Sequence, residues 1–237
     1  MSMAHRASSV LLLLLAGCAY VATTRRPDGY YAGISQGEDD RPLFKSDAAV
    51  LTDADIERIL NRRLALPKQN RIAVLSLSGS SSWRFYSDDT VRLNEALDRE
   101  FIGALKTSSR VYDASYLPAL LVPENRTAPH LREAAARYQA DLLLAYRSRC
   151  ASYEKFRFFS ADETRAYCSV EAVLLDVRTG IVPFTAVSTN DVETTKGAED
   201  KNLAETIKRN ELAAIGKSLN EIARDLVHFL DATPDKR

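Results

Sequence analysis

The chain has 237 residues, of which 46% are hydrophobic and 27% charged, as is usual for a globular domain. Its 32 basic and 32 acidic residues cancel to a formal net charge of zero, which excludes the overall basic field of a nucleic-acid-binding protein. Only three histidines and three cysteines are present, so little material exists for a transition-metal site. We therefore expect no metal, no other cofactor and no nucleic-acid partner.

Residues 1–17 have the features of a signal peptide rather than of a folded segment. His5 and Arg6 form a weakly basic start, and the apolar run from Val10 to Leu15 is far shorter than the ~20 residues that cross a bilayer as a helix. Leu15-Ala16-Gly17-Cys18 then matches the lipobox of bacterial lipoprotein precursors. We predict cleavage before Cys18 and lipidation of its thiol. The alternative is an ordinary secretory signal with a chance cysteine.

The residue after the lipobox bears on the membrane that would hold the protein. Ala19 stands where an aspartate would retain an enteric lipoprotein in the inner membrane, so we predict the outer membrane, with the inner membrane as the less favoured choice. Several acyl chains, typically including palmitate, anchor a protein stably where one chain would be marginal. Residues 18–47 contain prolines, glycines and scattered charges without an apolar period, which predicts a flexible tether.

Beyond the tether we expect a single periplasmic domain over residues 48–232, with its core at 70–230 and a disordered tail at 233–237. Thr52 predicts the start of a helix, which Pro67 ends, with Ile56, Ile59, Leu60 and Leu64 on one face. This helix either leads into the domain or packs across its sheet.

The hydrophobic pattern predicts the elements that follow. They are a strand at 71–77, a helix from Asp89 or Thr90, a short strand at 111–112, a helix at 131–138, strands at 140–158, 164–177 and 181–192, and a helix at 200–230. This order, β-α-β-α-β-β-β-α, predicts an α/β fold in which helices pack on a mixed sheet. A signal peptide, a tether and one helix precede it.

The strands at 140–158 and 164–177 specify their own register. We place Cys150 opposite Cys168, so that paired residue numbers sum to 318. One face then receives opposite charges across the strands: Arg147 with Glu171, and Lys155 with Glu163. The other face receives apolar or small pairs: Leu144 with Leu174, Tyr146 with Ala172, and Ser148 with Val170. A shift by one residue would lose these pairs and exchange the faces.

This register makes the two cysteines cross-strand neighbours. Export as a lipoprotein would place them in the periplasm, where disulfides persist. We therefore predict a Cys150–Cys168 disulfide, which would stabilise the fold by about 3 kcal/mol in the chain-entropy model. Two separately buried free thiols are the alternative.

The tip of the same hairpin is a candidate partner surface. Its aromatic residues are Tyr153, Phe156, Phe158 and Phe159, with Lys155 and Arg157 beside them. Exposed rings next to basic side chains suit a protein partner or lipid headgroups. The alternative is that the rings fold back onto a helix.

No catalytic constellation is found in the sequence. The serine-rich loop from Ser78 to Ser82 lacks both the nucleophile-elbow spacing and the Walker lysine. His130 and His228 have no companion that the sequence places beside them. We expect a protein that is not an enzyme.

Three short stretches resemble the periplasmic domains of a group of bacterial lipoproteins. They are Arg71-Ile72-Ala73-Val74-Leu75, Ala140-Asp141-Leu142-Leu143-Leu144 and Leu174-Leu175-Asp176-Val177-Arg178-Thr179-Gly180. The group contains the curli-secretion lipoprotein, the penicillin-binding-protein-activator lipoproteins and, in the same broad fold group, the TolB amino-terminal domain. The resemblance covers about residues 70–230 and implies binding and assembly at the cell envelope, without enzymatic activity.

One feature departs from the curli-secretion lipoprotein, which contributes membrane-spanning hairpins to a pore. Such strands need an apolar lipid-facing side of ~9–11 alternating residues. The outward face here is charged instead, with Arg147, Arg149, Lys155, Arg157, Glu163 and Glu171. A pore of that type is not expected.

Together these features predict a non-catalytic, outer-membrane-anchored lipoprotein whose periplasmic domain binds an envelope protein in an assembly or regulatory role. One alternative is a small-ligand-binding or hydrolytic lipoprotein with a cleft near Ser78. Another is an oligomeric secretion component.

Overall fold

The computed structural model describes residues 30–35, 42–44, 51–62, 64–78, 87–155, 163–195 and 202–235. The predicted signal peptide, Cys18 and most of the tether lie outside these residues. Phe156, Phe158 and Phe159 at the hairpin tip also lie outside them.

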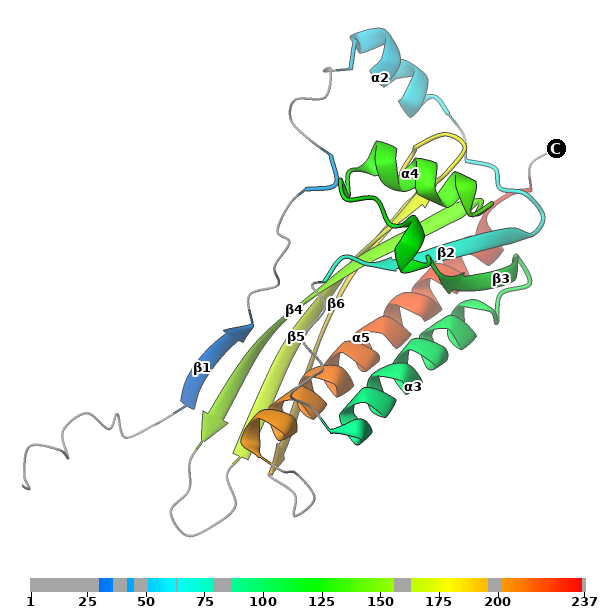
Figure 1. Cartoon of the computed structure of the whole chain (residues 1–237). Coiled ribbons are helices and arrows are strands. Elements are labelled where there is room, and N and C mark those ends of the chain that lie inside the picture. The colour runs from blue at the N-terminus through cyan, green and yellow to red at the C-terminus, as the bar shows by residue number, and fades with distance from the viewer. Residues whose placement is uncertain are drawn as a thin grey trace, which may run out of the picture.

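A single mixed sheet forms the centre of the molecule (Figure 1). Its main strands, in the spatial order β3-β2-β4-β5-β6, are β2 (Asn70–Ser76), β3 (Val111–Tyr116), β4 (Leu142–Lys155), β5 (Glu163–Asp176) and β6 (Phe184–Thr195). β2 runs parallel to β3 and β4, and β4, β5 and β6 run antiparallel to one another. The predicted α/β class and element order are confirmed.

An additional strand, β1 (Tyr30–Ser35), lies within the predicted tether and corrects that prediction. β2 pairs only with the first part of β4, from Leu142 to Tyr146. The second part of β4 therefore has an edge that β2 leaves open, and β1 pairs there, antiparallel, with positions 150–155. A free edge attracts a pairing strand, even a short one with weak sequence signals.

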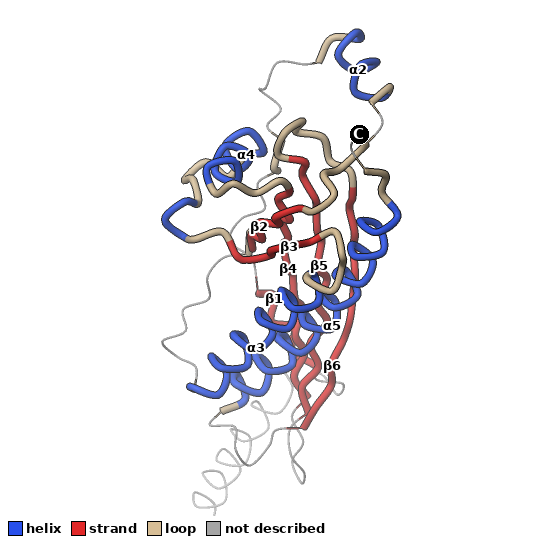
Figure 2. Tube along the Cα trace, turned by 90° about the vertical axis from the view of Figure 1, so that its right-hand side faces the viewer, coloured by secondary structure: helices blue, strands red, loops and turns tan. Residues whose placement is uncertain are grey.

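Three helices cover the sheet (Figures 1 and 2). α3 (Asp88–Leu105) and α5 (Leu203–Ala232) lie side by side on one face, and α4 (Ala128–Arg137) lies on the other. Alternation along β4 sends Leu142, Leu144 and Tyr146 to the α3–α5 face, and Leu143 and Ala145 to the α4 face. The single strand β4 therefore contributes side chains to both layers of the core.

Gly216 lies where α3 and α5 approach each other, and the Leu97 side chain occupies the space beside it. A methyl group at this position would lie 2.5 Å from Cδ2 of Leu97 on α3. The missing side chain lets the buried stripe of α5 reach the sheet while α3 packs beside it.

Several element boundaries differ from the prediction. The helix that begins after Thr52 ends at Leu60 rather than at Pro67 and so does not include Leu64, and β3 runs to Tyr116 rather than ending at residue 112. Two further differences have identifiable reasons. α3 begins at Asp88, because the Ser87 hydroxyl accepts a hydrogen bond from the Thr90 amide and caps the helix. β6 begins at Phe184 rather than at residue 181, directly after Pro183. Proline has no amide hydrogen to donate to the strand ladder.

The predicted register of the β4–β5 hairpin is confirmed at every position. Cys150 pairs with Cys168, and the two form a disulfide. The bond is buried beneath α5, packed with Ala166 and Ala214. Arg147 faces Glu171 across the strands, as predicted, and Glu171 forms an ion pair with Arg149 at 3.7 Å.

Candidate protein-binding site

α2 (Asp53–Leu60) is a short helix whose ends are stabilised locally. The Thr52 hydroxyl accepts a hydrogen bond from the Asp55 amide at 3.2 Å and donates one to the Asp55 carboxylate at 2.7 Å. Arg58 forms an ion pair with the same carboxylate at 3.0 Å. These contacts confirm Thr52 as the predicted N-cap and satisfy polar groups in the first turn of the helix.

The apolar face of α2 is not buried by the described part of the chain. Ile56, Ile59 and Leu60, called the α2 stripe below, are 42%, 41% and 79% exposed. They follow the helical spacing of an apolar stripe, yet no residue of the helix is buried. The prediction left open whether this helix packs across the sheet. Among the described residues it does not, and it stands off one end of the sheet (Figure 1).

The charge of α2 indicates which kind of binding partner suits the α2 stripe. The helix carries three carboxylates, on Asp53, Asp55 and Glu57, against the single guanidinium of Arg58. Helices that lie in membrane surfaces are typically rich in lysine and arginine, which anionic lipids attract. An acidic amphipathic helix suits a hydrophobic groove on another protein.

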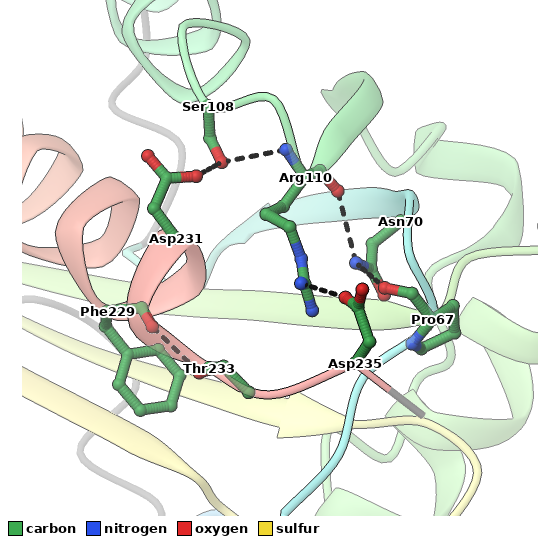
Figure 3. Close-up of polar contacts among 8 residues, drawn as sticks. All are labelled: Pro67, Asn70, Ser108, Arg110, Phe229, Asp231, Thr233 and Asp235. Carbon is green, nitrogen blue, oxygen red and sulfur yellow. Dashed lines mark hydrogen bonds and ion pairs between the residues drawn. The ribbon is translucent and has the colours of Figure 1, made fainter. Parts of the chain in front are cut away.

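The segment that follows α2 is fixed to the body of the domain by the C-terminal residues (Figure 3). The Leu66 amide donates to the Pro234 carbonyl at 3.2 Å, and Arg110 forms an ion pair with Asp235. Asn70 donates to the carbonyls of Pro67 and Arg110, at 3.1 Å each. The predicted disordered tail at 233–237 is therefore wrong for positions 233–235, because their polar groups have partners on neighbouring segments.

A cavity of about 130 Å³ lies beneath this segment, lined by Leu64, Leu66, Asn70, Asp141 and Asp176 among others. Its carboxylates are already engaged. Asp141 accepts from the Arg71 amide and from Arg178, and Asp176 accepts from the Arg178 amide and from Thr179. Sites for small organic ligands usually have about 300–1,000 Å³. The small volume and the engaged carboxylates do not favour a ligand site here.

The most strongly perturbed titratable groups form a network between α3 and the sheet. The Tyr116 hydroxyl donates to Asp98 at 2.7 Å and lies 3.1 Å from the Tyr146 hydroxyl. Burial raises the pKa of Asp98 and the pKa of both tyrosines above their ordinary values. The three groups partner one another within the core, so this network has a structural role. This network could not be predicted from the sequence, because its members come from three separate elements.

Those other residues that the sequence singled out and the structure describes do not assemble into a site. The Ser78 hydroxyl accepts from the Ser148 amide at 2.8 Å, so it extends the contact of β2 with β4. His130 bonds to Thr127 at 2.7 Å. Tyr153 lies on β4, partly buried, while the phenylalanines grouped with it fall outside the described residues. Within the described part of the chain, no three metal-ligating side chains of the His, Cys, Asp or Glu type gather.

The outward face of the hairpin is polar, as predicted. Arg165 forms an ion pair with Asp191 on β6 at 2.7 Å, beside the Arg149–Glu171 pair. Tyr167 and Val187 are 50% and 69% exposed on this face. Paired charges leave it without the contiguous apolar area that the α2 stripe has.

No protein-family model and no curated protein sequence matches the chain. The chain is similar in fold to several solved structures. One is a predicted lipoprotein from Caulobacter crescentus, with 14% identity, a TM-score of 0.37, and coverage of 67% of this chain and 89% of that chain. Another is the LpoB C-terminal domain from Salmonella enterica, with 10% identity, a TM-score of 0.31, and coverage of 56% and 90%.

A third is the lipoprotein GNA1162 from Neisseria meningitidis, with 12% identity, a TM-score of 0.29, and coverage of 65% and 96%. At these TM-scores the likeness is partial. The structural neighbours include bacterial lipoproteins, as the sequence resemblance predicts. Over the described residues, no helix has the length and apolar character needed to cross a membrane.

Proposed function

We propose that this protein is a non-catalytic lipoprotein, anchored through Cys18 to the periplasmic face of the outer membrane, whose domain binds an envelope protein through the α2 stripe. The lipobox supports the anchor. The observation that carries the binding role is the exposure of Ile56, Ile59 and Leu60 on a helix that is capped at its own ends. Exposed apolar stripes of this kind mark docking elements.

The partner that fits this helix has a hydrophobic groove with a basic rim. The groove would take the three apolar side chains, and the rim would face Asp53 and Glu57, which lie along one edge of the stripe. Burying a fully exposed apolar side chain contributes about 1.5–3 kcal/mol, and Ile56 and Ile59 would contribute less because they are already partly buried. Association costs at least about 4 kcal/mol in lost freedom. The balance favours a weak, reversible contact, which suits an accessory role.

Site-specific photocrosslinking in intact cells tests the proposal. A photoreactive phenylalanine analogue replaces Leu60 in the stripe, and the matched control places it at Ala54, which is exposed on the opposite side of α2. We expect an adduct of one reproducible mass from position 60 and none from position 54. Adding Ile59→Glu should abolish the adduct, whereas Ala54→Glu should not. Equal labelling from both positions, or none from either, would contradict this role of α2.

A further inference from the structure

The register of β1 gives the molecule a direction relative to its predicted lipid anchor. Tyr30, the first residue of β1, pairs with Lys155 at the hairpin end of β4, and Ser35 pairs with Cys150 further back. The chain therefore enters the sheet at its hairpin end, where β5 begins at Glu163 and β6 ends at Thr195. α2 stands off the other end, where β2 and β4 begin (Figures 1 and 2).

The pairing of β1 also shortens the tether. Tyr30 follows Cys18 by 12 positions, since 30 − 18 = 12. Such a segment spans about 40 Å when fully extended and about 20 Å on average as a flexible coil. β4 has 14 residues, so the sheet extends about 45 Å from its hairpin end to its other end. The anchor can hold the hairpin end at the membrane, but an upright domain cannot reach the membrane with its α2 end.

From this geometry we infer that the hairpin end of the sheet faces a lipid surface and that β1 turns the α2 stripe away from it. This inference rests on the lipid at Cys18 in the proposed function. It further specifies from which side a partner would reach the α2 stripe. The partner approaches from the periplasm rather than from the anchoring membrane. The predicted free tether of residues 18–47 would set no such direction, because it would leave the domain free to turn.

Depth-dependent fluorescence quenching tests the orientation. The chain from Cys18 onward carries a fluorescent amino acid at Thr195, exposed at the hairpin end, or at Gln69, exposed near α2. Coupling the Cys18 thiol to a maleimide lipid then attaches the protein to phosphatidylethanolamine–phosphatidylglycerol vesicles that contain spin-labelled headgroups. The other two of the three cysteines form the disulfide, so only Cys18 reacts. We expect at least about threefold stronger quenching at position 195 than at 69, because spin-label quenching acts only over short distances.

Two variants test whether β1 is the cause. Ala32→Pro with Gly33→Pro removes amide donors from β1, and should bring the two quenching values close together. A twenty-residue Gly/Ser insertion between Cys18 and Tyr30 leaves β1 intact and should lower quenching at position 195. Equal quenching at both positions in the unaltered chain, or stronger quenching at 69, would overturn the inference. Because the maleimide supplies the lipid, these outcomes are separate from the question of natural acylation, which mass spectrometry of the cellular protein answers.

Discussion

α2 and α4 are both short helices with apolar residues at helical spacing, yet only α4 is packed. Leu131 and Ala135 of α4 are almost completely buried against β2 and β4. Ile59 and Leu60 of α2 are exposed. α4 connects two strands of the sheet, β3 and β4, so the crossover carries it over the sheet face. α2 precedes β2 with no such constraint, and its apolar face remains available.

The largest expected difference in stability is between truncations of an apolar residue in α4 and in α2. Leu131→Ala should lower the free energy of unfolding by about 2–5 kcal/mol, because it leaves a cavity in a packed layer. Leu60→Ala should change it by less than about 0.5 kcal/mol, as at other exposed positions. Urea unfolding followed by circular dichroism measures both. Similar losses from the two variants would show that α2 is packed after all.

The next largest effect on stability is expected from the disulfide of the β4–β5 hairpin. Replacing Cys150 and Cys168 together by alanine should cost about 3 kcal/mol, because an 18-residue separation is no longer closed in the unfolded chain. Unfolding with and without reductant measures this. The variant should be insensitive to reductant and the natural chain sensitive. A natural chain that reductant leaves unchanged would rule out the bridge in solution.

Helix caps give a smaller, matched comparison. Ser87→Ala removes the cap of α3, which packs on the core, and should lower global stability by about 1 kcal/mol. Thr52→Ala removes the cap of α2 and should leave global stability unchanged, while hydrogen exchange in α2 becomes faster. Native-state exchange reports both. A global loss from Thr52→Ala equal to that from Ser87→Ala would mean that α2 unfolds together with the core.

The smallest expected effect is a pH dependence from Asp98. Burial raises the pKa of this carboxyl, while the Tyr116 hydrogen bond opposes the rise and Glu95 adds to it. Because the folded pKa exceeds the unfolded one, the stability contribution is present below the unfolded pKa and is lost as pH rises through the folded pKa. Asp98→Asn keeps the acceptor and removes the titration. The stability of the natural chain relative to this variant should therefore fall as pH rises from below 3.8 towards neutral. A flat difference would contradict the assignment.

The sequence predicted the parts of the fold that carry redundant local signals. The β4–β5 register followed from charge pairs, small-residue pairs and two cysteines that all agree on one alignment. The sequence also predicted the stripe of α2, but not its exposure, because periodicity marks an apolar face without showing what covers it. β1 was missed for a different reason. Its pairing depends on the free edge of β4, some 120 residues later in the chain, and on no strong pattern of its own.

The compartment, the location of the partner in the envelope and the orientation of the domain all depend on a lipid at Cys18. Mass spectrometry of the protein purified from cell membranes tests it directly. We predict an N-terminal peptide that begins at Cys18 and carries diacylglycerol and an amide-linked acyl chain. Cys18→Ala should release the protein from the membrane fraction. An N-terminal peptide that begins elsewhere, or an unmodified Cys18 in a protein that stays soluble, would contradict the account.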